Sequence, residues 1–200
     1  MGTYPLTFPR RNFFDTLSIQ PSRKVLSEGL QIFREEVAAI KSVAGLSPNF
    51  ICYPLPTNAT ARMKSRGGNA LGIDQDEPLL RAYSVEEPPP TQCRDHSIEL
   101  TLRKTDLVIL LSTSWSTASD DTAVMTMTKN MIERTRSSAQ RAGVAHPFLY
   151  LNYAAVGRAP EVFAGYGERN VERLKSVQAA VDPRGVFTAN GLWRGFMKLW

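Results

Sequence analysis

The chain has 200 residues, of which 42% are hydrophobic and 22% are charged, a composition typical of a folded globular protein. Its net charge is +5, but the 24 Lys and Arg residues are spread along the sequence without a run, which argues against nucleic-acid binding. Two cysteines and two histidines are too few for a disulfide framework or a Cys/His metal site, so we expect no bound metal.

The N-terminal stretch up to Ser18 lacks the apolar core of a signal peptide. No apolar run is long enough to span a bilayer. These features predict a cytoplasmic protein.

Hydrophobic periodicity predicts a strand, a helix and a second strand near the N-terminus. The first strand begins at Phe13. The helix begins at Ser22, and its apolar residues recur at steps of three and four: Leu26, Leu30, Phe33, Val37 and Ile40. The second strand begins at Asn49, and Pro54 and Pro56 confine its end to a sheet edge or a bend.

The next fifty residues contain a glycine cluster and an unusual segment. A short helix is predicted after Thr57 or Asn58, ending at the sequence "GGNALG". This cluster lacks the Lys-Ser/Thr of a phosphate-binding loop, so we interpret it as a turn. The segment 81–106 has a Pro triplet, mixed charges and little periodicity, and we interpret it as an anomalous insertion or surface loop.

The second half of the chain predicts two strands and two long helices. "LVILLSTSW" from Leu107 is typical of a central strand covered on both faces. The following helix begins at Asp120 or Asp121, ends at Gly143, and has an apolar side of Val124, Met127 and Met131. "PFLYLNYA" from Pro147 predicts the last strand. The final helix covers 168–181, with inward residues Val171, Leu174, Val177 and Val181.

Strands that alternate with long helices predict a single domain over residues 1–200, of α/β or α+β class. Three polar residues in the last strand are candidates for chemistry. There Tyr150 and Asn152 would point to one face and Tyr153 to the other. They could hydrogen-bond neighbouring loops, or a phenol beside a cavity could act as acid, base or hydrogen-bond donor.

Several stretches resemble one known family. "YLNYA", "GYGERNVERLKSVQAAVDPRGVF" and the closing "GFMKL" look like the C-terminal end of fungal FAD-linked oxidoreductases. That group is akin to berberine bridge enzymes and has a vanillyl-alcohol-oxidase-type flavin fold. "PLPTNATARMKSRGGNALGI" and "LLSTSWSTASDD" resemble the substrate domain of the same family, in the same order. The resemblance covers most of the chain from Phe13 to Leu199, apart from the unusual segment 81–106.

The resemblance implies an α+β fold, with helices on one face of an antiparallel sheet and a substrate cavity on the other. Tyr153 matches the Tyr of the family's Asn-Tyr pair near the flavin, and Asn152 matches its neighbour. We therefore expect Tyr153 and Tyr150 to be catalytic, and Asn152 and Tyr153 to contact FAD. The family's N-terminal flavin-binding half, with its Arg-Gly-Gly-Gly-His-like stretch, has no match in this sequence. Segment 81–106 would then be a translated intron, because relatives continue almost directly into the Leu107 strand.

Three functions follow as hypotheses. The first is the substrate-domain half of a FAD-linked oxidoreductase of secondary metabolism, without redox activity alone because the cofactor carries that chemistry. The second is a flavin-independent cyclase or isomerase that retains the cavity, with a Diels–Alder-type ring closure as one example. The third is a partner subunit of a separate flavin domain, or a homo-oligomer. In each, we expect a small natural-product intermediate as the ligand.

Overall fold

The computed structural model describes residues 10–56, 62–63, 65–71, 73 and 105–186. Its centre is a four-stranded sheet in the order β2-β3-β1-β4, with every adjacent pair antiparallel. The strands are β1 (Arg11–Ile19), β2 (Ser47–Pro56), β3 (Thr105–Trp115) and β4 (Ala145–His146). The predicted α+β class with an antiparallel sheet is confirmed.

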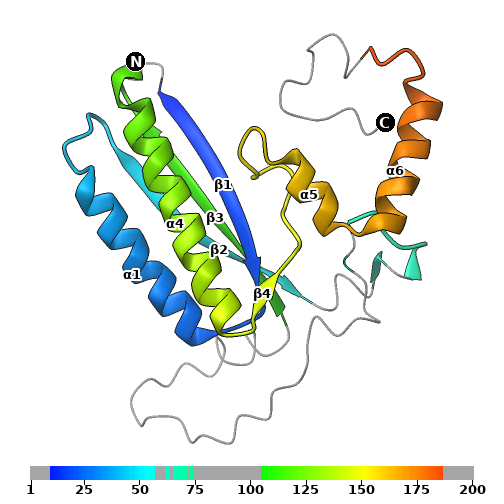
Figure 1. Cartoon of the computed structure of the whole chain (residues 1–200), viewed down its shortest axis with the longest axis horizontal. Helices are drawn as coiled ribbons and strands as arrows, with labels where there is room; N and C mark the ends of the chain where they lie inside the picture. The colour runs from blue at the N-terminus through cyan, green and yellow to red at the C-terminus, as the bar shows by residue number, and fades with distance from the viewer. Residues whose placement is uncertain (1–9, 57–61, 64, 72, 74–104, 187–200) are drawn as a thin grey trace, which may run out of the picture.

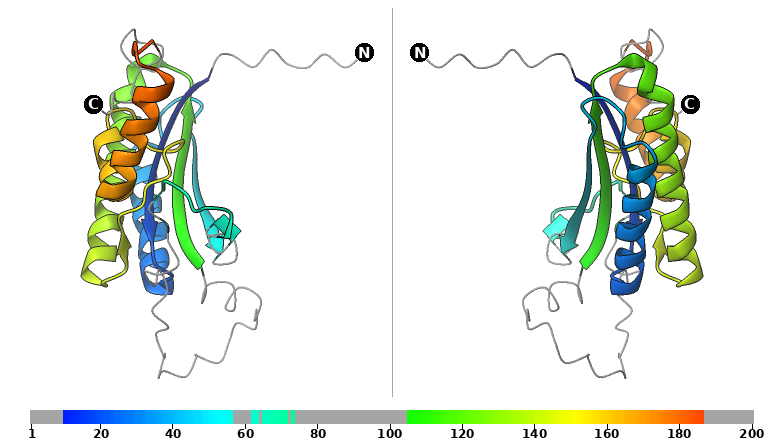
Figure 2. Two further views of the ribbon diagram at one scale, coloured as in Figure 1. Left: turned by 90° about the vertical axis from the view of Figure 1, so that its right-hand side faces the viewer. Right: turned by 90° about the vertical axis from the view of Figure 1, so that its left-hand side faces the viewer.

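The helices lie on one side of this sheet. They are α1 (Arg23–Ala39), α4 (Asp121–Arg141), α5 (Ala159–Gly165) and α6 (Glu168–Val181), and a 3-10 turn, η1 (Ala118–Asp120), precedes α4. Figure 1 shows α1 and α4 running side by side across the sheet, with α5 and α6 beyond the β1 edge. In both views of Figure 2 the four helices stay to one side of the strands. The opposite face of the sheet is free of α1 and α4, while Val162 of α5 shares a second core with Val108 of β3.

Helix α1 begins where the sequence predicts. The Oγ of Ser22 accepts a hydrogen bond from the backbone N–H of Val25 over 3.3 Å, which satisfies one of the free donors of the first turn. Leu26 and Phe33 then pack on the main core, formed by buried residues of β1, β3 and α4: Leu17, Ile19, Leu107, Ile109, Leu111, Met131, Ile132 and Ala139, together with Val25 of α1. Burial of this apolar area drives the packing of the layer.

Strand β3 is the central strand, as predicted. Its residues from Leu107 to Leu111 are all buried, and it lies between β2 and β1. Because successive side chains point to opposite faces, Leu107, Ile109 and Leu111 face the helices and Val108 faces away. Strand β2, which carries Pro54 and Pro56, lies at the sheet edge, where the missing backbone donors of proline are tolerated.

The strand predicted from Pro147 is wrong. Pairing ends at His146, and the backbone carbonyl of Tyr150 accepts from the N–H groups of Tyr153 and Ala154 over 2.9 and 3.2 Å. These bonds close a turn. Phe148 is buried by side-chain packing with residues such as Val108, rather than by strand pairing. An apolar run with aromatic residues can be a buried strand or a loop whose side chains pack in the core. Here it is such a loop.

Two details of the predicted helices also need correction. Val177 and Val181 of α6 were expected to point inward, but they are 50% and 73% exposed, because no other described element covers that side of the helix. Asp120 occupies the N-cap of α4 without capping it through its side chain, since its carboxylate accepts from the hydroxyl of Thr117. Helix α5 lies in a stretch that was expected to be a loop.

Other predicted features lie partly or wholly outside the described residues. Of segment 81–106, only 105–106 is described, at the start of β3, and most of the short helix after Thr57 is not described. The turn in "GGNALG" is confirmed, because Gly68 donates to the carbonyl of Met63 over 2.9 Å and both Gly67 and Gly68 have positive φ. Among the described helices, none has the length and apolar character needed to cross a membrane.

Candidate functional site

Three tyrosines from distant parts of the chain meet at one place. Tyr53 comes from β2, and Tyr150 and Tyr153 come from the turn after β4. The rings of Tyr53 and Tyr153 are stacked, with centroids 5.8 Å apart, and the ring of Tyr150 meets Tyr153 edge-on at 4.8 Å. Both arrangements are favourable for aromatic rings. We call Tyr53, Tyr150 and Tyr153 the tyrosine cluster.

The tyrosine cluster lies on the face of the sheet that α1 and α4 leave free. Tyr53 pairs in register with Val108, so their side chains project to the same face. Val108 packs with Phe148 and other residues of a second core, separate from the core beneath α1. Tyr53 is 41% exposed at this position. The cluster thus presents aromatic surface and hydroxyl groups to solvent.

The turn after β4 changes how the predicted site residues are arranged. A strand would have placed Tyr150 and Tyr153 on opposite faces, whereas the turn brings their rings together. Asn152 remains close to Tyr150, because its Nδ2 donates to the Tyr150 hydroxyl over 2.9 Å. The structure therefore gathers all three predicted residues.

Tyr53 is a member that the sequence reading missed. In β2, Ile51, Tyr53 and Leu55 occupy alternate positions, and Tyr53 falls on the face away from the main core. The sequence shows only a tyrosine on one side of a predicted strand. This position does not indicate a site, because its partner Tyr153 is 100 residues away in sequence.

The electrostatics of the cluster favour hydrogen-bond donation. Hydrogen bonding with the Tyr53 hydroxyl, followed by burial, raises the pKa of Tyr153 above its usual range. The raised pKa disfavours the phenolate form of Tyr153, so this phenol is suited to hydrogen bonding rather than to acting as a base. The Tyr150 oxygen already accepts from Asn152, which leaves its own proton free to be donated.

A buried ion pair holds the turn against β1. The guanidinium of Arg158 contacts the carboxylate of Asp15, and their side chains are only 16% and 8% exposed. The Oδ1 of Asp15 also accepts from the N–H groups of Thr16 and Ala155 over 2.8 and 3.3 Å. Arg158 donates further to the carbonyl of Thr16 over 2.9 Å. This network fixes the far end of the turn that carries Tyr150 and Tyr153.

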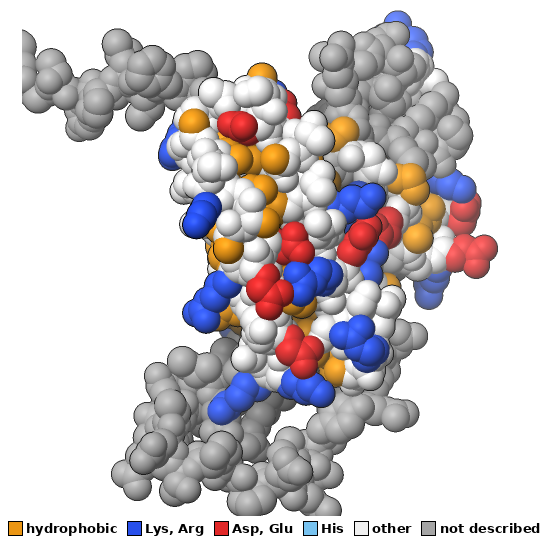
Figure 3. Space-filling view, turned by 60° about the vertical axis from the view of Figure 1, so that its left-hand side comes forward, with side chains coloured by type: hydrophobic (Ala, Val, Ile, Leu, Met, Phe, Trp, Pro, Cys, Tyr) orange, Lys and Arg blue, Asp and Glu red, His pale blue; other side chains and the backbone are white. Residues whose placement is uncertain are grey.

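The remaining titratable groups of the described residues form no metal site. No three His, Cys, Asp or Glu residues gather closely enough among them to bind a metal ion. Figure 3 shows Lys/Arg and Asp/Glu side chains interleaved over the side of the molecule that carries α1 and α4. Burial lowers the pKa of His146, whose Nδ1 accepts from the N–H of Phe148 over 3.1 Å, so the neutral form of this histidine is favoured.

The tyrosine cluster fits one side of a flat aromatic ring. Its stacked and edge-on rings give π-surface, and its hydroxyl groups give hydrogen-bond donors beside that surface. Within the described ranges, the glycine pair Gly67 and Gly68 forms a turn rather than a phosphate-binding loop at a helix start. The described part of the chain therefore offers contacts to a flat ring rather than to a phosphate group.

Known proteins with similar sequences are named as flavoenzymes. The chain is 29% identical over 184 residues to a FAD-dependent monooxygenase of Cochliobolus heterostrophus, and 27% identical over 182 residues to one of Fusarium proliferatum. These matches cover 89% and 88% of this chain. A protein named an oligopeptidase, from Diaporthe leptostromiformis, is 32% identical over 55% of this chain, but over only 10% of its own length.

The chain spans about 30% of the length of the two monooxygenases it matches. No family model matches it. No solved structure matches it either. Nearly the whole chain is therefore similar in sequence to one part of fungal proteins that are named FAD-dependent monooxygenases.

Proposed function

We propose that this chain forms the substrate-domain part of a FAD-dependent oxidoreductase that modifies a natural-product intermediate. The observation that carries the proposal is the tyrosine cluster on the face of the sheet opposite α1 and α4, in a chain similar to FAD-dependent monooxygenases. The berberine bridge-type relationship is the finer form of this proposal. It rests on the Asn152–Tyr153 pair of the sequence: Tyr153 belongs to the cluster, and Asn152 donates a hydrogen bond to Tyr150.

In this function the tyrosine cluster forms one wall of the cavity in which flavin and substrate meet. FAD, when bound, supplies the redox chemistry by accepting electrons from the substrate. Tyr53 and Tyr153 give the flat surface against which a ring lies. Tyr153 and Tyr150 donate hydrogen bonds to a substrate oxygen and so orient it for reaction.

The Asp15–Arg158 ion pair is a positioning element in this proposal. It lies at the end of the turn, away from the tyrosine rings, and it holds the backbone of Ala155 through a hydrogen bond to Asp15. The proposed wall combines β2 with the turn after β4, so the distance between these two segments must be fixed. Small displacements of an orienting group reduce rate strongly.

Flavin binding by the 200-residue chain tests this proposal directly. We would titrate the chain into FAD and, separately, into lumiflavin, and follow the flavin fluorescence, which stacked tyrosines quench. Because the cluster offers contacts to the ring and not to the diphosphate, we expect similar affinities for the two flavins. The variants Tyr53→Leu and Tyr153→Leu should each weaken binding at least about fivefold. The reason is that stacking of a flat heterocyclic ring on an aromatic side chain contributes about 1–3 kcal/mol to the binding free energy.

Tyr166→Phe is the matched control. Tyr166 is buried in the second core and stacks on Phe148, away from the open surface, so its hydroxyl should not affect flavin binding. No quenching by either flavin would contradict the proposal and favour the flavin-independent cyclase. Quenching that persists in both Leu variants would contradict the assignment of the site.

A further inference from the structure

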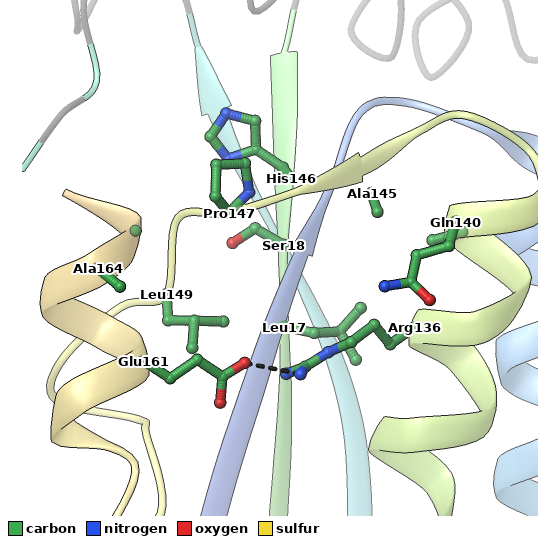
Figure 4. A pocket seen from close by; sticks show the side chains of 12 residues that line it. Leu17, Ser18, Arg136, Gln140, Ala145, His146, Pro147, Leu149, Glu161 and Ala164 are labelled. Atoms are coloured by element: carbon green, nitrogen blue, oxygen red, sulfur yellow. Dashed lines mark ion pairs between the residues drawn. The ribbon is translucent and has the colours of Figure 1, made fainter. Parts of the chain in front are cut away.

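A cleft of about 460 Å³ lies between α4, α5 and the edge formed by β1 and β4 (Figure 4). Its volume is in the range of small-molecule pockets. Apolar side chains line much of it: Leu17, Ala139, Leu149 and Ala164. An ion pair of 2.6 Å between Arg136 of α4 and Glu161 of α5 closes one side. No residue of the tyrosine cluster lines this cleft.

One wall of the cleft is fixed by a close backbone approach. A Cβ atom on Gly165 of α5 would lie 2.2 Å from the carbonyl oxygen of Pro147, so only glycine permits this contact. Helix α5 therefore sits tightly on the segment after β4. Since the position of this wall depends on packed backbone rather than on long side chains, the cleft is preformed.

Ser18 gives the cleft an unmet hydrogen-bonding group. The residue is 3% exposed, and its Oγ has no hydrogen-bond partner among the described residues. In Figure 4 the Ser18 hydroxyl points into the space between β1 and α5, and Gln140 of α4, which also lines the cleft, lies on the other side of β1. A buried hydroxyl without a partner is unfavourable, so a ligand that bonds it removes that penalty.

The charges around the cleft balance. Glu161 pairs with both Arg136 and Arg158, and Arg158 also pairs with Asp15, giving two cations and two anions. A charged ligand would find no unpaired opposite charge in this group. Apolar walls, a hydroxyl and an amide instead suit a neutral ring with one polar substituent.

We propose that this cleft binds a neutral, ring-containing small molecule whose carbonyl or hydroxyl group hydrogen-bonds Ser18. This goes beyond the proposed function, because no residue of the tyrosine cluster lines the cleft and binding there needs no flavin. A ligand held there contacts both α4 and α5. It therefore stabilises the packing of α5 against the rest of the domain.

An NMR titration of the isotope-labelled 200-residue chain tests the proposal. Acetophenone and 2-phenylethanol are the neutral probes, with a carbonyl and a hydroxyl respectively, and benzoate is the charged control. We expect saturable shifts of the amides of Ser18, Gln140 and Leu149 with the neutral probes, a higher Tm in their presence, and weaker binding of benzoate.

Two substitutions separate ligand binding from folding. Ser18→Ala removes an unsatisfied hydroxyl, so the Tm of the free protein should stay the same or rise while the Kd of both neutral probes increases about five- to tenfold. Ala164→Leu, at an exposed position of α5 that lines the cleft, should block binding without unfolding the chain.

Thr135→Val is the matched control for Ser18→Ala. Thr135 is also fully buried with an unpartnered hydroxyl, but it lies on α4 outside the cleft, so its substitution should leave binding unchanged. The proposal is overturned if neither neutral probe gives saturable shifts, if the shifts map away from the cleft, or if Ser18→Ala binds as tightly as the original chain.

Discussion

The two halves of this molecule are held together in different ways. In the layer of β1, β3, α1 and α4, fully buried residues such as Ile109 and Met131 form a continuous core. In the region after β4, α6 has no fully buried residue, and the turn is held by the Asp15–Arg158 ion pair. The first region thus has a continuous apolar core, whereas the second combines a smaller core around Phe148 and Val162 with a few specific polar contacts. The candidate sites lie where the second region meets the first.

The largest effect should come from breaking the apolar layer. Met131→Ala removes a fully buried side chain, and we expect it to lower the free energy of unfolding by about 2–5 kcal/mol. Val181→Ala, at a 73% exposed position of α6, should change it by less than about 0.5 kcal/mol. Urea denaturation measures both. Equal effects would show that α6 is packed in solution as tightly as α4.

A smaller and more local effect should follow from breaking the Asp15–Arg158 ion pair, called here the polar anchor. Asp15→Asn keeps the shape of the side chain but removes the buried partner of Arg158, which then pairs only with the more exposed Glu161, and this should cost about 1–3 kcal/mol. Faster amide exchange should appear in residues 150–158 before it appears in α4.

Glu172→Gln serves as the comparison for the anchor. It breaks the exposed Lys175–Glu172 pair of α6, which should have no measurable effect on unfolding. An Asp15→Asn protein with unchanged stability and unchanged exchange in 150–158 would refute the role of the anchor.

The smallest expected effect concerns pH. Burial lowers the pKa of His146 in the folded chain below its ordinary value of 6.5. The unfolded chain therefore binds a proton at higher pH than the folded chain. The contribution of neutral His146 to stability is thus fully present above pH 6.5 and is lost as the pH falls below it. Substituting His146→Asn, which keeps an acceptor for the N–H of Phe148, should remove this part of the acid sensitivity.

Unfolding curves from pH 7.5 to 5 test this expectation. His96→Gln, at the other histidine of the chain, is the control and should retain the loss below pH 6.5. A loss of the same size in the His146→Asn protein would assign the acid sensitivity to other groups.

The sequence by itself determined the parts of the molecule that have strong periodicity. The steps of three and four in α1 and α4 and the apolar run of β3 each reflect burial that a single element imposes on its own residues. These patterns predicted helices packed on a sheet and left α/β and α+β open, and the resemblance to a known family favoured α+β. Tyr150, Asn152 and Tyr153 could be singled out because they are polar residues in an apolar stretch.

The tertiary structure alone decided how these residues meet. Whether "PFLYLNYA" pairs as a strand or turns back depends on what covers Phe148, and that is set by Val108, forty residues earlier in the sequence. The same holds for the stack of Tyr53 on Tyr153 and for the unpartnered hydroxyl of Ser18 beside α5. Local patterns record which face of an element is buried. They do not record which distant element buries it, because that depends on how all elements pack at once.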